Sequence, residues 1–207
     1  MNSIDRIVEL EDLQLQRGGR PLFHMPVSAR FAPGVLSIVA GPNGSGKSSL
    51  LDIIALRSAP PNAAMIRCAH QIQSTDVAYL PQQLWDVFDI RISDLVALAM
   101  GRDCRAPVNA PEPLLDALAN QKKDLGALSD GQRQLLLFWL VFSQAKYFFV
   151  YDEPLQHLDN VAAEYVFNGI EQQVRQGMLV VISEHSSETR WDIACQRIRL
   201  ALCAAAA

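Results

Sequence analysis

The sequence lacks a surplus of basic residues. Its 18 lysines and arginines are outnumbered by 22 acidic residues, and the formal net charge is -4. Proteins that bind nucleic acid normally gather positive charge on one face to meet the phosphate backbone. The composition therefore argues against a nucleic-acid partner, and we expect none.

Long apolar runs are also missing. The longest, Leu135–Phe142, lies between Gln134 and Ser143 and falls well short of the roughly 18 residues that a membrane-spanning helix needs. Residues 1–20 mix acidic, basic and apolar side chains, which is not the pattern of a secretory signal peptide. We therefore expect a cytosolic chain without a membrane span of its own.

Cysteine is scarce and shows no pattern. The four cysteines form neither a CxxC pair nor the spacing of a Cys/His metal site: Cys68, Cys104, Cys195 and Cys203. They are interpreted as ordinary thiols, and nothing in the sequence requires an oxidising compartment.

Hydrophobic content, by contrast, is ample for a packed core. Half of the 207 residues are hydrophobic, and the length suits one domain, taken as residues 1–203. Short apolar segments alternate with helical patterns, which predicts an α/β fold with a largely parallel sheet. The predicted strands are 6–16, 26–31, 35–40, 76–80, 147–151 and 178–183, of which the first two form an antiparallel N-terminal part. The predicted helices begin near Lys47 and cover 131–143 and 161–176.

Residues 84–127 have a different character. Helical pieces at 92–100 and 113–118 are separated by glycine and proline. Because these two residue types end helices, the segment is interpreted as a small helical insertion.

A complete phosphate-binding loop follows the strand 35–40. The segment matches G-x-x-x-x-G-K-[ST], and strand, loop and helix occur in the order that this motif requires. Its residues are Gly41, Pro42, Asn43, Gly44, Ser45, Gly46, Lys47 and Ser48, with Ser49 in the helix behind them. Glycines let backbone amides converge on phosphate oxygens, and a helix N-terminus favours an anion. Lys47 is predicted to reach the β- and γ-phosphates of ATP, and Ser48 to bind Mg²⁺.

Two acids, Asp152 and Glu153, end the apolar strand 147–151. In phosphate-loop ATPases the first such acid belongs to the Mg²⁺ shell, and the next polarises the attacking water. The alternative is a pair of solvated acids in a turn before Pro154. The phosphate loop upstream favours the catalytic interpretation.

Four further motifs resemble those of the ATP-binding cassette family. Residues 128–132, Leu-Ser-Asp-Gly-Gln, are similar to its signature motif, and Leu158-Asp159 is similar to its D-loop. Gln82 resembles the Q-loop glutamine, which implies contact with the magnesium site and with the helical insertion. His185 resembles the switch histidine. All motifs occur in the family's order, and the resemblance covers residues 8–200.

The resemblance implies a phosphate-loop NTPase fold and a head-to-tail dimer that buries two ATP molecules. Ser129 and Gly131 would contact the γ-phosphate of the ATP held by the other copy, and Asp159 would cross the dimer seam. Glu153 would be the general base, while His185 would hold the γ-phosphate and the attacking water.

Three of these residues also have an ordinary interpretation when taken alone. His185 could be a surface histidine, Gln82 a turn residue and Ser129 a helix cap. Their positions relative to Lys47 and Glu153 are what favour the functional interpretation.

Four positions depart from the family's pattern. Asp130 replaces the first glycine of the signature, as it does in some similar cassettes, including iron-chelate importers, and we expect it to be harmless. Arg17 stands where an aromatic residue usually stacks on adenine, and a guanidinium can also stack on a base. Tyr151 replaces an aliphatic residue, and Glu184 replaces a small residue or threonine.

A cassette without membrane spans implies a separate transmembrane permease and a second cassette, with a homodimer preferred. The chain would then lie peripherally at the cytoplasmic face of the membrane. Residues 92–102 are similar to a stretch of importers of iron chelates, vitamin B12 and zinc or manganese, which predicts import of a metal chelate or similar solute. The alternative for this stretch is an ordinary amphipathic helix. An exporter cassette for haem or a peptide, and a soluble cassette outside transport, remain alternatives.

Overall fold

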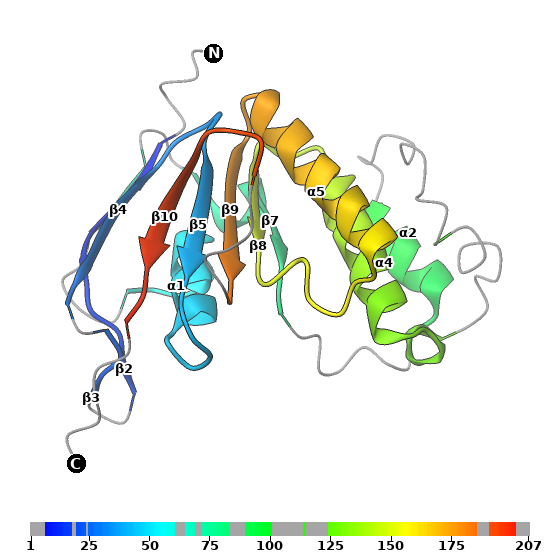
Figure 1. Ribbon diagram of the computed structural model, residues 1–207, viewed down its shortest axis with the longest axis horizontal. Helices are drawn as coiled ribbons and strands as arrows, with labels where there is room; N and C mark the ends of the chain where they lie inside the picture. The colour runs from blue at the N-terminus through cyan, green and yellow to red at the C-terminus, as the bar shows by residue number, and fades with distance from the viewer. Residues whose placement is uncertain are drawn as a thin grey trace.

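A parallel five-stranded sheet forms the centre of the structure (Figure 1), a computed structural model that describes residues 7–17, 20–23, 25–60, 65–68, 72–82, 90–100, 114, 124–185 and 191–201. The strand order is β10-β5-β9-β8-β7, and every neighbouring pair is parallel. The strands are β5 (Leu36–Ala40), β7 (Val77–Leu80), β8 (Phe148–Tyr151), β9 (Leu179–Glu184) and β10 (Cys195–Arg199). The three interior strands are buried at every residue. This burial explains their short apolar sequences, because both faces of such a sheet are covered.

A three-stranded antiparallel sheet makes up the N-terminal part. Its central strand β1 (Val8–Leu13) pairs with β4 (Val27–Phe31) and with β6 (Met65–Cys68). The register with β4 shifts between Leu10 and Leu13, where Asp12 has a φ of 52°, so the strand carries a bulge. A short hairpin of β2 (Gln16–Arg17) and β3 (Arg20–Pro21) follows β1.

Four helices and two 3₁₀ turns are described. The helices are α1 (Lys47–Ile54), α2 (Ile92–Met100), α4 (Asp130–Phe142) and α5 (Asn160–Arg175), and the turns are η2 (Ser74–Asp76) and η3 (Leu125–Ala127). Within the described ranges, each helix falls short of the length and apolar character needed to traverse a bilayer.

The parallel sheet separates two hydrophobic cores. Alternate residues of β8 point to opposite faces: Phe148 and Val150 join the core shared by α1 and the antiparallel sheet, whereas Phe149 and Tyr151 join the core under α2, α4 and α5. In Figure 1, α4 and α5 accordingly lie on one side of the sheet and α1 on the other. The sheet is thereby held rigidly by packing on both faces.

The predicted fold class is confirmed, with corrections in detail. The predicted strand 6–16 is two strands, β1 and β2, because they pair in different sheets. Strands β3, β6 and β10 were not predicted. Within the predicted insertion 84–127, α2 is present, and of the helix expected at 113–118 the structure describes Leu114, which is helical and buried. The domain boundary at residue 203 stays a prediction.

Candidate active site

The phosphate loop joins the carboxyl end of β5 to the start of α1. Gly44 and Gly46 have φ values of 77° and 88°, a left-handed conformation that glycine adopts without strain. A Cβ on Gly41 would lie 2.7 Å from Ser45 Oγ and 2.8 Å from the carbonyl oxygen of Leu200. Gly46 caps α1 without a side-chain hydrogen bond, so the first amides of this helix are available to an anion.

Lys47 turns its ammonium group back over the loop. Its Nζ donates to the carbonyl oxygens of Gly41 at 3.0 Å and Pro42 at 3.3 Å. It also lies 3.1 Å from Glu153 Oε1, and the two side chains are only 5% and 7% exposed. The loop and the acidic pair are therefore joined by a buried ion pair.

Glu153 is held from three directions. Gln82, just after β7, donates its Nε2 to Glu153 Oε2 at 3.0 Å, opposite the contact with Lys47. The backbone amide of Glu153 donates to Ser183 Oγ at 2.8 Å. Its φ of 49° is unusual for a residue with a side chain and costs of the order of 1 kcal/mol. Strain of this kind is characteristic of functional sites.

Asp152 is buried beside this group. The hydroxyl of Ser183 donates to its Oδ1, whereas Oδ2 has no hydrogen-bond partner among the described residues. Burial raises the pKa of Asp152, and the hydroxyls of Ser183 and Ser48 lower it in part. A buried carboxylate oxygen without a donor fits the binding of a cation or of its water shell.

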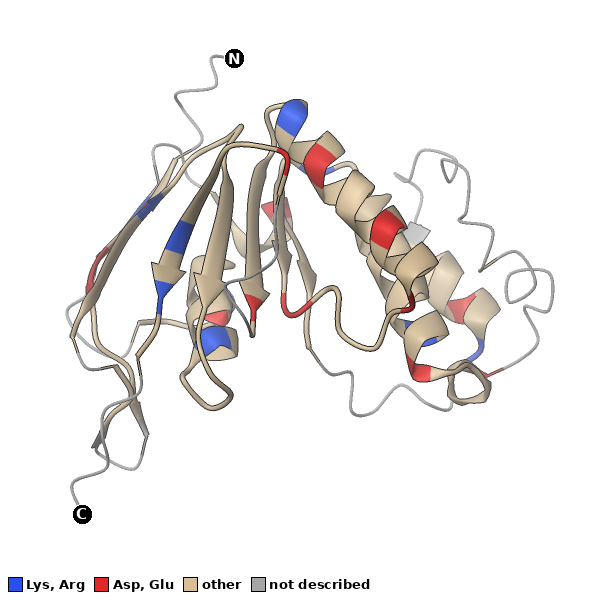
Figure 2. Ribbon diagram, viewed as in Figure 1, with Lys and Arg blue, Asp and Glu red and all other residues tan. Residues whose placement is uncertain are grey.

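A cavity of about 520 Å³ adjoins the loop. Its lining brings together residues far apart in the chain: Gln16, Leu22, Asn43, Gly44, Gly46, Lys47, Ser48, Ser49, Gln82 and Glu153. Figure 2 shows acidic residues after β8 and at the end of β9, at the sheet edge where α1 begins with a basic residue. Of the predicted site, the loop, Gln82 and Glu153 thus meet at one cavity.

His185 lies at a second, smaller cavity of about 220 Å³. Glu153 lines this cavity too, together with Ser183 and Glu184. The histidine is exposed. Glu153 therefore stands between the cavity at the phosphate loop and the one at His185.

The signature residues lie at neither cavity. Ser129 caps α4 in a capping box: its Oγ accepts from the amide of Gln132 at 3.2 Å, and its own amide donates to Gln132 Oε1 at 3.1 Å. Asp130 is 73% exposed and lies 3.1 Å from Arg133 of the same helix. Gly131 approaches the loop between β8 and α5, since a Cβ there would stand 2.8 Å from the carbonyl oxygen of His157.

Asp159 caps α5, its Oδ1 accepting from the amide of Ala162 at 2.8 Å. It too is absent from both cavities. Arg17 contributes backbone to β2, and its side chain lies outside what the structure describes. The described neighbours that reach the cavity are Gln16 and Leu22. Sequence reasoning missed both of them, and also Ser183, which carries no motif of its own.

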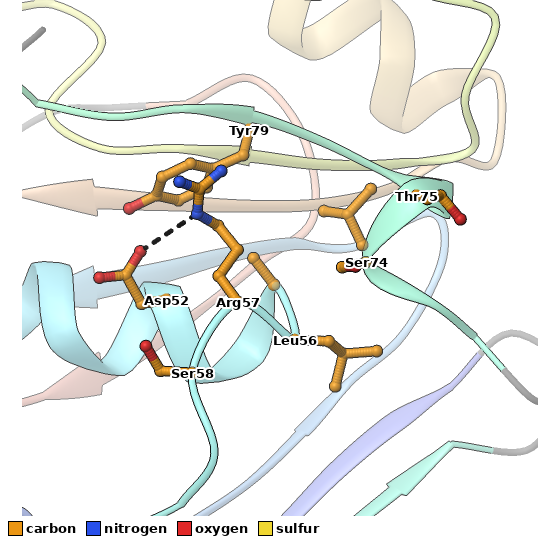
Figure 3. Close-up of a pocket in the computed structure, with 9 residues that line it drawn as sticks. Asp52, Leu56, Arg57, Ser58, Ser74, Thr75 and Tyr79 are labelled. Atoms are coloured by element: carbon orange, nitrogen blue, oxygen red, sulfur yellow. Dashed lines mark ion pairs between the residues drawn. The ribbon is translucent and has the colours of Figure 1, made fainter.

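Another cavity, of about 470 Å³, lies at the far end of α1 (Figure 3). Arg57 approaches Asp52 to 3.6 Å and lies 4.7 Å from the centre of the Tyr79 ring. The positive charge of Arg57 is paired with the negative charge of Asp52, so this cavity suits a phosphate group less well than the loop does.

Comparison with known proteins places the chain in a family. The family model for ABC transporters matches residues 25–156. The vitamin B12 import ATP-binding protein of Vibrio vulnificus is 28% identical over 185 residues, covering 78% of this chain and 73% of that one. The cytochrome c biogenesis ATP-binding export protein of Cupriavidus pinatubonensis is 27% identical over 193 residues, covering 88% and 85%. A solved ATP-binding protein of Pyrococcus furiosus, described as a putative ABC transporter, superposes with a TM-score of 0.71 at 21% identity, covering 94% and 97%. The chain therefore belongs to the ABC transporter family, as an ATP-binding cassette with the ATPase fold of that family.

Proposed function

We propose that two copies of this chain bind ATP with Mg²⁺ between them, hydrolyse it, and thereby drive a separate transmembrane permease. The observation that supports the proposal most directly is the group formed by Lys47, Glu153 and Gln82 beside the phosphate loop, all lining one cavity of about 520 Å³. A cavity of this size suits a ligand of nucleotide dimensions.

The chemistry follows from the charges around Glu153. When ATP enters, its γ-phosphate competes with Glu153 for Lys47, which is 3.1 Å from the carboxylate. The freed carboxylate then accepts a proton from the attacking water as the water oxygen bonds to the γ-phosphorus and the bond to the ADP oxygen breaks. His185, across the adjoining cavity, would hold the water and the γ-phosphate.

Mg²⁺ would be held by Ser48, Gln82 and Asp152, the last of these acting directly or through water. The buried Oδ2 of Asp152 has no hydrogen-bond partner among the described residues, which fits such a role. When bound, Mg²⁺ neutralises negative charge on the phosphate oxygens. A site of oxygen ligands is the kind that Mg²⁺ prefers.

A second copy completes the site. Ser129, Gly131 and Asp159 lie away from the cavity of their own chain, and Ser129 caps the N-terminus of α4, an end that favours phosphate. In a head-to-tail homodimer this end would face the γ-phosphate held by the other copy. The carboxylate of Asp130 is engaged by Arg133 at 3.1 Å, which limits its repulsion of that phosphate.

Within transport, we favour import of a metal chelate or a similar small solute. The stretch that carries the importer resemblance includes α2, where Leu98 is 76% exposed and offers an apolar contact to a permease helix at the cytoplasmic face of the membrane. The export relative, of which the chain covers 85%, keeps an exporter of haem or a peptide as the second candidate. Co-purification with a permease, and uptake or efflux by cells that carry the pair, separates the two.

The test of the mechanism is Glu153→Gln, with Glu164→Gln, an exposed acid of α5, as the matched control. We expect Glu153→Gln to lower ATP turnover by about 10²–10⁴-fold, the usual contribution of a general base, while ATP binding persists. Light scattering after gel filtration in MgATP should then show a stable dimer. Turnover at the parental rate, or monomers under these conditions, contradicts the proposal. If the chain alone hydrolyses ATP at its full rate, and a permease does not change that rate, the soluble alternative is favoured.

A further inference from the structure

A third buried carboxylate lies beside Asp152 and Glu153 and has no role in the mechanism above. Glu184 ends β9, directly between Ser183 and His185, and is only 6% exposed. Trp191 donates its Nε1 to Glu184 Oε1 at 2.9 Å, and Arg197 of β10 approaches Oε2 to 3.0 Å. A buried carboxylate is tolerated when both of its oxygens are engaged in this way.

These two partners connect Glu184 to separate parts of the fold. Arg197 lies within β10, which pairs with β5 rather than with β9. The Trp191 ring packs against Phe167 of α5, with ring centroids 4.3 Å apart. The end of β9 is therefore fastened both to the edge strand of the sheet and to a helix that covers it.

The position of Glu184 in the chain relates this anchor to the active site. Ser183 already contacts both acids, through the amide of Glu153 and Oδ1 of Asp152. His185 follows Glu184 directly, at the bend where β9 ends, and Ser183, Glu184 and His185 all line the cavity that Glu153 borders. Fixing Glu184 therefore limits where the backbone of His185 can lie.

We propose that Glu184 is a positioning residue, which through Trp191 and Arg197 sets the place of His185 relative to Glu153 during ATP hydrolysis. This inference rests on the proposed function. The competing explanation is that Glu184 only fastens β10 to the sheet. In that case, replacing Glu184 should change ATP hydrolysis by the same factor whether or not His185 is present.

The experiment is a double-mutant cycle between Glu184→Gln and His185→Ala in the full chain, with kcat and the KM for ATP measured in the steady state with ATP in excess over protein. Glutamine keeps the size of the side chain but loses the charge facing Arg197. We expect Glu184→Gln to lower kcat about tenfold with KM unchanged, less than the roughly 10²-fold that a 1 Å misplacement costs. In the His185→Ala background the same change should lower kcat less than about twofold.

The control is Glu171→Gln. Glu171 is also a buried carboxylate engaged at both oxygens, by Arg175 at 2.9 Å and by the amide of Asp192 at 2.9 Å, but it lines neither cavity of the site. It should leave kcat within about twofold of the parent. The inference is overturned if the parent protein has normal activity and Glu184→Gln leaves kcat unchanged. It is also overturned if Glu184→Gln lowers kcat by the same factor with and without His185.

A second variant guards against loss of folding in Glu184→Gln. Trp191→Phe removes a single hydrogen bond to Glu184 and keeps an aromatic ring against Phe167. It should show the same dependence on His185 with a smaller loss of kcat, and an equal loss in both backgrounds overturns the inference as well. A parent without any ATPase activity would instead refute the proposed function itself.

Discussion

Replacing Lys47 by methionine should destabilise the nucleotide-free protein by an amount that the structure allows us to estimate. Lys47 Nζ and Glu153 Oε1 are 3.1 Å apart, with side chains 5% and 7% exposed, so the pair belongs with buried ion pairs. Removing one partner of such a pair costs about 3–5 kcal/mol because the other charge stays buried. Gln82 still donates to Glu153 at 3.0 Å, which places the expected loss at about 3 kcal/mol.

Urea unfolding followed by circular dichroism measures this loss. With a slope of about 2–3 kcal/mol/M for a chain of this size, the midpoint should fall by about 1–1.5 M. Lys146→Met is the matched control, since the Lys146 ammonium donates to the carbonyl oxygen of Thr75 at 2.6 Å in an exposed setting. This control should cost about 1 kcal/mol or less.

A double variant tests whether the loss comes from the pair. When Lys47→Met is combined with Glu153→Gln, no uncompensated carboxylate remains, so the double variant should be more stable than the sum of the single losses predicts by at least about 1.5 kcal/mol. If Lys47→Met unfolds at the same urea concentration as the Lys146→Met control, or if the single losses simply add, the reasoning about this pair is wrong.

Two further predictions concern residues that depart from the family's pattern. Burial raises the pKa of Tyr151, so its hydroxyl stays protonated and donates to Gln173 Oε1 at 2.9 Å; Tyr151→Phe should cost about 1–3 kcal/mol in urea unfolding, and adding Gln173→Leu should restore part of it. Asp130→Gly removes a carboxylate that is 73% exposed and paired within its own helix, so ATP turnover should stay similar or rise, and a large loss of turnover would instead give Asp130 a positive role.

The elements that could be predicted from the sequence are those whose surroundings are uniform. Strands β5, β8 and β9 are buried on both faces, so each had to be a short apolar run. Helix α4 is preceded by a serine, which is followed three residues later by a glutamine, a pattern that predicts the observed capping box. Such signals depend only on residues that are neighbours in the chain, and they can therefore be recognised in the sequence.

Strand β10, at one edge of the parallel sheet, lacked such a signal. β10 reads Cys-Gln-Arg-Ile-Arg and is exposed at both ends, and only its pairing with β5, a segment far away in the chain, makes it a strand. Tertiary pairing of this kind overrides local preference.

The site shows the same division. The loop and the acids follow from motifs, whereas the contact of Gln82 with Glu153 and the bridging role of Ser183 depend on how β7, β8 and β9 lie side by side. Glu184 could be recognised from the sequence as unusual, but its partners Trp191 and Arg197 are visible only in the folded chain.

The narrow space at Gly131 has a mechanical consequence. A hydrogen atom is the largest substituent that fits between the start of α4 and the carbonyl oxygen of His157, so the two backbones meet without an intervening side chain. His157 stands only four residues after Glu153. Because the two backbones are in contact, a shift of the loop that carries Glu153 and His157 must also move the start of α4. In the paired arrangement proposed above, each copy would then signal the progress of its own hydrolysis to the nucleotide of its neighbour.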